Sequence, residues 1–291
     1  MALDWRDLPS FQPDTTIVLF IPGLSGSSSS EYIQHMIEAT EEHGFRCVVM
    51  NFRGTAGVPL ESGTIYSAGW TSDLRFIANL IHEKYPNALK IGIGFSLGSN
   101  VLVKYTCEEG EKTPLSMIIS ISNPYDLTAS IEFLESGTKL YTKILTYGVV
   151  QTFKKNKERL KELGCKINDH LIENSQTLSA YDENFTSKMF GFKSAYHYYL
   201  HSGCRQYIRG GVIKREHEEH KGEIVPGLKV PTIFISARDD PIIPETVIPI
   251  EECLESENTL LILTSHGGHV SFCEGLLPIG KSWMDRLVAQ M

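Results

Sequence analysis

The chain has 291 residues, of which 42% are hydrophobic and 21% charged, an ordinary composition for a globular protein. Its formal net charge is −8 at pH 7. Nucleic-acid binding needs a basic face that neutralises phosphates, so this charge argues against nucleic acid as the main partner. The same charge gives no general attraction to anionic lipid surfaces.

The spacing of the cysteines and the composition of the amino terminus indicate the cellular compartment in which the protein is expected. No two of the six cysteines have the C-x-x-C spacing of metal and redox sites, so we predict reduced thiols in an intracellular protein, with no metal and no other cofactor. The first residues, MALDWRDLPSFQPD, lack the basic region and the apolar stretch of a signal peptide. No run approaches the roughly 18 apolar residues of a transmembrane helix. We therefore expect a cytoplasmic or peripherally membrane-associated protein.

Short, nearly continuous apolar runs recur along the chain, and each ends at a turn or a polar cluster. They predict strands over 16–21, 46–50, 90–93, 117–121, 232–236 and 260–263. Runs of this kind suit strands that are covered on both faces of a parallel sheet. Segments with helical periodicity alternate with them, over 31–43, 70–85, 99–109 and 276–291. The alternation predicts an α/β fold with a doubly wound, mostly parallel sheet, which binds ligands at the carboxyl ends of its strands.

The alternation breaks between about Asn123 and Val230, where the chain is more helical and richer in charged and aromatic residues. We predict a helical cap over residues 124–229, inserted into an α/β core made of residues 1–123 and 230–291. The alternative is a run of extra helices with no role at the site. The aromatic residues between 181 and 199 are candidates for the wall of an acyl-chain tunnel, or they simply hold the cap together. With a basic cluster over 154–161, they predict peripheral membrane contact through the cap.

Residues 92–98 read GIGFSLG and lie between a predicted strand and a predicted helix. In this context G-x-S-x-G indicates a nucleophile elbow, a sharp turn that lifts the serine hydroxyl clear of the sheet. Gly94 and Gly98 are needed because side chains there would collide with the turn or its neighbours. Ser96 is therefore the candidate nucleophile, at the amino end of a helix that favours negative charge.

A serine nucleophile needs a base and the base needs an orienting acid, which in this class of sheet follow in the order Ser, Asp or Glu, His. Asp239 and Asp240 follow one predicted strand, and His266 and His269 follow the last one. We favour Asp240 because the proline after it directs a strand-end carboxylate into a turn, which leaves Asp239 as a neighbouring turn residue. We favour His269 because two glycines before it give a flexible loop. The alternative is that either histidine merely caps the last strand.

Acyl transfer also needs N–H donors for the developing oxyanion. The backbone amide of Leu97, directly after the nucleophile, is the first candidate. The backbone amide of Leu24, in the PGLSG loop after the first predicted strand, is the second. A phosphate-binding loop is the competing interpretation, and it is disfavoured because no Gly-Lys-Ser/Thr follows.

Other motifs fail on spacing or context. The glycines of the elbow are spaced G-x-G-x-x-x-G, one residue too many for a dinucleotide-binding fingerprint. His217 and His220 are three residues apart and lie in the charged run 214–221, which favours an exposed linker over a zinc site. Asp73, near the start of a predicted helix, is expected to compensate the helix dipole.

With the elbow, the PGLSG loop and the Asp-Asp-Pro and Gly-Gly-His segments in hand, the chain resembles the α/β-hydrolase superfamily. Within it, the chain is similar to the AB hydrolase 4 family, which includes abhydrolase-domain proteins 1 and 3, the plant EMB8 type and the bacterial YheT type. The matching stretches are PGLSGSSSSEYI (22–33), NFRGTAGVPL (51–60), YSAGWTSDLRF (66–76), FSLGSNVLVKY (95–105), ISNPYDL (121–127), YDENFTSKMFGFKSAYHYY (181–199), ARDDPIIP (237–244) and TSHGGHVSFCEG (264–275).

The resemblance implies Ser96 as nucleophile, Asp240 as triad acid and His269 as base. It implies hydrolysis of carboxylic esters of lipid-like substrates: phospholipids, acylglycerols or medium-chain acyl esters. Eukaryotic relatives usually carry a membrane anchor and two more strands, of which only residues 2–5 remain, so we expect shortened amino-terminal strands. The expected partner is a lipid or small-ester substrate, and the sequence fixes no oligomeric state. Two alternatives stay open: an acyltransferase or ester synthase with an alcohol acceptor, and a non-catalytic binding module.

Overall fold

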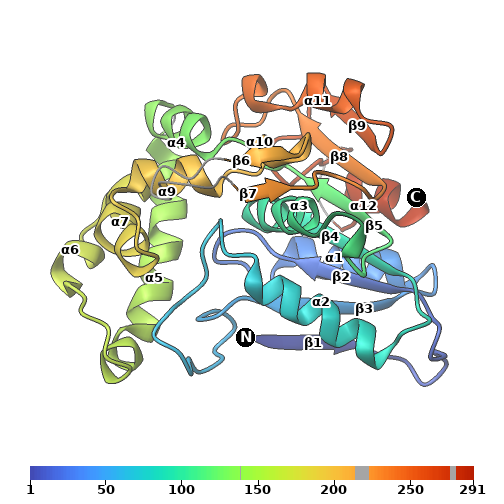
Figure 1. Cartoon of the computed structure of the whole chain (residues 1–291), viewed down its shortest axis with the longest axis horizontal. Coiled ribbons are helices and arrows are strands. Elements are labelled where there is room, and N and C mark those ends of the chain that lie inside the picture. Colours follow the sequence, from blue (N-terminus) through green and yellow to red (C-terminus); the bar gives the residue numbers. More distant parts are fainter. Residues whose placement is uncertain (138, 214–222, 276–279) are drawn as a thin grey trace.

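The computed structural model describes residues 1–137, 139–213, 223–275 and 280–291. Its main sheet has the strand order β1-β3-β2-β4-β5-β8-β9 (Figure 1). The strands are β1 (Ala2–Arg6), β2 (Ile17–Ile21), β3 (Arg46–Asn51), β4 (Lys90–Phe95), β5 (Met117–Ile121), β8 (Thr232–Ala237) and β9 (Thr259–Thr264). Neighbouring strands are parallel, except that β1 runs antiparallel to β3 at one edge. The predicted α/β class and each predicted strand are confirmed, and β1 adds a five-residue strand at the edge of the sheet.

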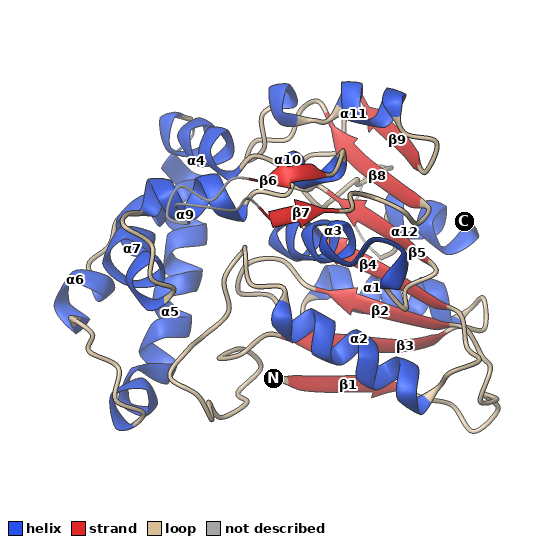
Figure 2. Ribbon diagram, viewed as in Figure 1, coloured by secondary structure: helices blue, strands red, loops and turns tan. Residues whose placement is uncertain are grey.

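Helices cover both faces of the sheet (Figure 2). One face carries α2 (Ser72–Lys84) and α3 (Leu97–Glu109), and the other carries α1 (Glu31–Glu41) and α12 (Trp283–Gln290). Alternate residues of β2 divide between these layers: Ile17 and Leu19 join the first, and Val18 and Phe20 join the second. Burial of both faces is the reason why β2 is apolar throughout.

The last helix begins later than its periodicity predicts. The residues at 276–279 of the predicted helix lie outside the described residues, and Gly280 has a φ of +77°. The helix starts at Trp283, where a capping box closes it: the Asp285 amide donates to the Ser282 hydroxyl, and the Ser282 amide donates to the Asp285 carboxylate. The S-x-x-D pattern behind this start is visible in the sequence.

A group of helices lies beside the sheet, at the left of Figure 1. It comprises α4 (Leu127–Ser136), α5 (Lys139–Glu162), α6 (Asp169–Glu173), α7 (Leu178–Tyr181), a π-helical turn (Asp182–Thr186), α8 (Ser187–Met189) and α9 (Ala195–Ser202). Many of its apolar side chains, among them Leu134, Val149, Phe153 and Phe185, form a cluster that Leu60 and Ile65 join from the segment before α2. We call this group the cap helices. No helix of the described residues combines the length and the apolarity needed to cross a bilayer.

The chain then returns to the sheet through α10 (Arg205–Ile208) and the antiparallel pair β6 (Gly211–Ile213) and β7 (Glu223–Val225), and α11 (Ile250–Glu255) connects β8 to β9. Tyr207, Ile208 and Leu228 belong to the same apolar cluster as α2 and α3. The cap boundaries at 124 and 229 stay a prediction, and the segment after Cys204 shares its core with the sheet. The charged run 214–221, with its two histidines, lies outside the described residues.

Two glycines allow α3 to begin directly after β4. A Cβ atom on Gly98 would overlap the carbonyl oxygens of Ile21 and Pro22, and one on Gly94 would lie 2.5 Å from the Cα atom of Ser99. The start of α3 is therefore in direct contact with the end of β2. This contact is the structural reason for the glycines of the predicted elbow.

Replacing Gly98 with alanine is expected to lower the free energy of unfolding by about 3 kcal/mol or more, because the added methyl group has only backbone around it. The control is Gly44→Ala, where nothing lies within 4 Å and only the positive φ of +82° opposes a side chain, at a cost of about 1 kcal/mol. Denaturant unfolding of both variants measures the difference. Equal losses would contradict the importance of the contact.

Candidate active site

Ser96 occupies a strained turn between β4 and α3. Its φ of 51° and ψ of −120° are rare for a residue with a side chain, and its amide donates to the Ile121 carbonyl at 2.9 Å. The turn places the serine hydroxyl in the wall of a pocket rather than in the sheet. This is the geometry that the G-x-S-x-G pattern predicts.

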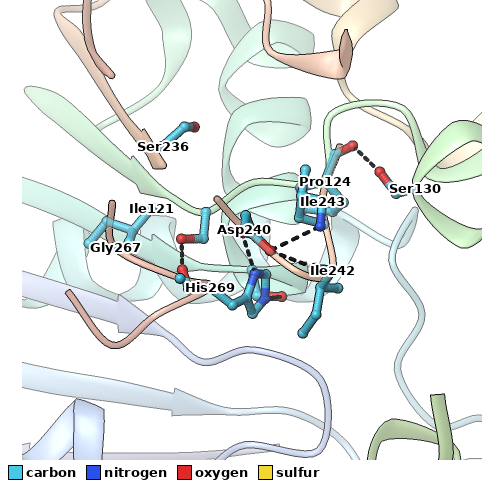
Figure 3. Close-up of polar contacts among 12 residues, drawn as sticks. Ile121, Pro124, Ser130, Ser236, Asp240, Ile242, Ile243, Gly267 and His269 are labelled. Atoms are coloured by element: carbon cyan, nitrogen blue, oxygen red, sulfur yellow. Dashed lines mark hydrogen bonds and ion pairs between the residues drawn. The ribbon is translucent and has the colours of Figure 1, made fainter. Parts of the chain in front are cut away.

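The three side chains proposed from the sequence meet at the carboxyl ends of β4, β8 and β9. The Oγ atom of Ser96 lies 2.7 Å from Nε2 of His269, and Nδ1 of His269 lies 2.7 Å from Oδ2 of Asp240. The Oδ1 atom of Asp240 accepts hydrogen bonds from the amides of Ile242 and Ile243 at 2.8 and 3.0 Å (Figure 3). Because Asp240 is buried and held on one side by backbone, its other oxygen is fixed toward the imidazole.

Asp239 and His266, the alternative acid and histidine, contact each other and not Ser96. Asp239 accepts hydrogen bonds from the amides of Gly267 and Gly268, each at 2.9 Å, and lies 3.2 Å from Nδ1 of His266. These donors hold the pKa of Asp239 below its usual value, the Gly268 amide most strongly. The side chain of His266 is 89% exposed, so it does not belong to the site. Asp239 is thus more than a turn residue, because its hydrogen bonds with the Gly267 and Gly268 amides fix the loop that carries His269.

The His269 loop is packed, which differs from the flexibility expected from its glycines. A Cβ atom on Gly267 would lie 2.6 Å from the Phe272 ring, and Gly268 has a φ of +62°. The Ser122 hydroxyl donates to the His269 carbonyl. The glycines are therefore needed for close packing and for a left-handed turn, and they fix the imidazole rather than let it move.

The two proposed oxyanion donors lie in the wall of the same pocket as Ser96. Leu97 is the first residue of α3, and Leu24 lies in the loop after β2. Among the described residues, neither backbone amide has a hydrogen-bond acceptor. Two unpaired amides beside a serine hydroxyl are the arrangement that an oxyanion needs, and their role stays a proposal.

Two tyrosines that the sequence analysis did not single out hold this loop on either side of Leu24. The Gly23 amide donates to the Tyr32 hydroxyl at 2.9 Å, and the Ser25 amide donates to the Tyr66 hydroxyl at 2.8 Å. Ser25 has a φ of 58°, so the loop turns sharply there. No local sequence motif marks either tyrosine as a partner of this loop.

A pocket of about 110 Å³ opens onto Ser96, with walls from the loops that follow the strands, from the start of α3 and from the cap helices. Most of its surface is apolar. The lining apolar residues are Leu24, Ile65, Ala68, Leu97, Pro124, Leu127, Ile131, Leu134, Leu145, Val149, Leu178, Ile242 and Ile243. Four tyrosines, at 66, 181, 198 and 199, also line it, so part of the aromatic segment 181–199 does reach the pocket.

Asp73 does more than compensate the α2 dipole. It is buried and forms an ion pair with Arg53, whose Nε donates to Oδ2 at 2.7 Å. Arg53 also donates to the Thr64 hydroxyl at 2.7 Å. The pair therefore holds the segment before α2, which supplies Ile65 and Tyr66 to the pocket.

One carboxylate, that of Asp182, also lines the pocket. Burial raises its pKa to about 6, and Glu135 adds to the increase, whereas hydrogen bonds from Thr186 and Tyr199 oppose it. The Tyr199 hydroxyl donates to Oδ2 of Asp182 at 2.7 Å. Nothing in the sequence pattern identifies this residue. Across the described part of the chain, no group of three or more His, Cys, Asp or Glu side chains is arranged to hold a metal ion.

Comparisons with known proteins agree with this geometry. A family model for the alpha/beta hydrolase fold matches residues 16–144. An abhydrolase domain-containing protein of Dictyostelium discoideum is 32% identical, over 100% of this chain and 69% of its own length. Phospholipase ABHD3 of Mus musculus is 31% identical, over 100% of this chain and 67% of its own length. A monoacylglycerol lipase of Saccharomyces cerevisiae is 30% identical, over 88% of this chain and 54% of its own length.

Solved structures share the fold at lower identity. An esterase of Pyrococcus furiosus has a TM-score of 0.52 and 17% identity, over 91% of this chain and 77% of that one. Est1E of Butyrivibrio proteoclasticus has a TM-score of 0.53 and 13% identity, over 99% of this chain and 91% of that one. Sheet order and strand-end side chains define the class as an α/β hydrolase. Within that class, the chain belongs to the AB hydrolase 4 family, as its resemblance implied.

Asp182→Asn is expected to stabilise the protein at neutral pH. The pKa of Asp182 is about 6 in the folded protein against an ordinary 3.8, so folding favours its neutral form. The carboxylate therefore costs nothing below pH 3.8, and its cost grows as the pH rises to about 6 and then stays constant. The asparagine should raise the free energy of unfolding by on the order of 2 kcal/mol at pH 7.5, and by less at pH 4.5. Denaturant unfolding at both pH values tests this, and a pH-independent difference would contradict it.

Proposed function

We propose that this chain, a carboxylic ester hydrolase, cleaves esters of lipid-like substrates through an acyl-enzyme on Ser96. The observation that carries the proposal is the hydrogen-bonded series from Ser96 through His269 to Asp240 beside an apolar pocket. The first two of these side chains are only partly buried, so an ester in the pocket can reach the serine.

The proposed reaction begins with attack of the Ser96 hydroxyl on the ester carbonyl. Nε2 of His269 accepts the hydroxyl proton, and Asp240 accepts a hydrogen bond from Nδ1 and stabilises the imidazolium. The imidazolium then protonates the leaving alcohol, which departs and leaves an acyl group on Ser96. Water, deprotonated by His269, attacks the acyl-enzyme and releases the acid.

The negative charge on the tetrahedral oxygen is assigned to the amides of Leu24 and Leu97. These amides need no rearrangement if the tyrosines at 32 and 66 keep the loop in place. Preorganised donors of this kind contribute more than donors that must first reorient.

The substrate class is proposed from the pocket and from the relatives. An apolar wall made largely of leucine and isoleucine suits an acyl chain, because burial of each methylene group contributes about 0.8 kcal/mol. The names of the relatives, phospholipase ABHD3 and monoacylglycerol lipase, support esters of phospholipids or acylglycerols. Medium-chain acyl esters fit the same chemistry.

Ser96→Ala is expected to lower ester hydrolysis by at least about 10³-fold and to abolish labelling by a fluorophosphonate probe, because the proposal assigns the acyl-enzyme to the Ser96 hydroxyl. The matched control is Ser136→Ala, an exposed serine of the cap helices that lies outside the pocket. Hydrolysis of a decanoyl ester and gel detection of the probe provide the two measurements. A stable Ser96→Ala protein with full activity would refute the proposal, and ester formation with added ethanol would favour acyl transfer.

We also propose that the cap helices contact membranes, at a different place from the basic cluster 154–161. In that cluster, Lys157 pairs with Glu173 at 2.8 Å and Lys161 with Asp169 at 2.5 Å. At the other end of α5, Leu140, Ile144 and Tyr147 are 58%, 55% and 67% exposed. Their spacing of four and three residues puts them on one face of the helix. We call these three residues the α5 stripe.

Ile144→Glu is expected to weaken binding to phosphatidylcholine vesicles at least fivefold, because it puts a charge on the α5 stripe where an apolar side chain would enter the lipid. Leu254→Glu is the control, since Leu254 is 83% exposed but lies on α11, away from the cap helices. Vesicle sedimentation measures binding, and hydrolysis of a water-soluble ester should stay unchanged. Equal binding by both variants and the parent protein would remove the α5 stripe from the interface.

A further inference from the structure

Asp182 is the only charged side chain among the described residues that line the pocket. It begins the π-helical turn Asp182–Thr186, an irregularity that often occurs at functional sites. No described lysine, arginine or histidine forms an ion pair with it. A carboxylate inside an apolar pocket therefore has only hydroxyl groups as partners.

Those hydroxyl groups leave part of the carboxylate unused. Tyr199 donates to Oδ2 at 2.7 Å, and Thr186, which also lines the pocket, helps to lower the pKa of the carboxyl group. Two carboxylate oxygens can accept about four hydrogen bonds, so lone pairs remain. Asp182 is only partly buried, and it lines the pocket. A ligand in the pocket can therefore reach its carboxylate.

Tyr181, the residue before Asp182, also lines the pocket. The side chain of Tyr181 is 2% exposed, and its hydroxyl has no hydrogen-bond partner among the described residues. Tyr66 and Tyr198 also line the pocket, but neither hydroxyl forms a hydrogen bond with that of Tyr181; they accept from the amides of Ser25 and Ala68. Tyr181 and Asp182 line the same pocket, and burial raises the pKa of the Tyr181 phenol, with Tyr66 and Asp182 adding to the increase. Leaving a buried hydroxyl unpaired is costly, so a ligand that pairs with it gains affinity.

We infer that Asp182 and Tyr181 form a polar subsite in the pocket that binds a hydroxyl group of the substrate. The inference rests on the proposed ester hydrolysis for the identity of the substrate. A hydroxyl donates its proton to the carboxylate and offers its oxygen to the Tyr181 phenol, so one group meets both needs. A quaternary ammonium group would leave the phenol unpaired, and a primary ammonium group would first lose its hydration in an apolar pocket.

The hydroxyl can come from either side of the ester. It can belong to the alcohol part, as in a partial glyceride, or to the acyl chain. Ether ligands separate these sources and are not cleaved, so their binding is measured whether or not the chain hydrolyses esters. The probes are 1-O-hexylglycerol for the alcohol side, 6-propoxyhexan-1-ol for the chain side, hexyl propyl ether without a hydroxyl, and 3-hexyloxypropan-1-amine as the cationic rival.

Calorimetric binding to the full chain at pH 7.5 tests the subsite. We expect one of the two hydroxyl ligands to bind at least tenfold more tightly than hexyl propyl ether, and the tighter one identifies the source. Asp182→Asn should reduce this preference at least fivefold, because an amide oxygen is a weaker acceptor than a carboxylate. Tyr181→Phe should reduce it at least threefold. Neither change should alter the affinity for hexyl propyl ether by more than twofold.

Tyr196→Phe is the matched control, because it removes a phenol from an exposed position of the cap helices, on α9, outside the pocket. It should keep the full preference. The inference is overturned if the parent protein shows no preference for either hydroxyl ligand, if the preference survives in Asp182→Asn, or if the amine binds more tightly than both hydroxyl ligands. An unchanged preference in Tyr181→Phe would overturn the part assigned to that phenol. Failure of the proposed hydrolysis would instead appear in the Ser96→Ala experiment, which uses no ether.

Discussion

The contact between the start of α3 and the end of β2 is the constraint on which the site depends. Gly98 permits it, because any side chain there would overlap the backbone of β2. The contact forces Ser96 into its strained turn and sets the Leu97 amide beside it. It also brings in the loop after β2, since a Cβ atom on Gly23 would lie 3.3 Å from that of Ser96. One close approach of backbone thus assembles nucleophile and both proposed oxyanion donors.

The two consecutive aspartates after β8, Asp239 and Asp240, position His269 in different ways. Asp240 turns inward and binds the imidazole of His269, and Asp239 turns outward and binds the backbone of the loop that carries it. Both acids lie beyond the end of β8 at Ala237, where a turn is closed by a hydrogen bond from the Asp240 amide to the Ala237 carbonyl. Both acids therefore act on His269, one through its ring and the other through the position of its loop.

The features that could be predicted from the sequence are those that local patterns determine: the strands and the nucleophile. Strand positions follow from apolar runs that two helix layers must cover, and Ser96 follows from a turn that only its glycines permit. Tyr32, Tyr66 and Asp182 could not be predicted in the same way, because each acts through a tertiary contact of its hydroxyl or carboxylate that no local pattern marks. The direction in which Asp239 and Asp240 point also depends on tertiary packing, so the choice between them rested on the following proline.

The π-helical turn at Asp182–Thr186 has a consequence for how such chains diversify. A π turn contains one residue more than regular helical winding, and each residue of an α-helix advances by about 100° around the axis. Deletion of a single residue there would restore regular winding and rotate Asp182 by about 100° relative to the residues that follow the turn. The proposed polar subsite and the proposed catalytic residues therefore lie in separate segments of the chain, and a change of length at the turn alters the first without altering the sequence of the second.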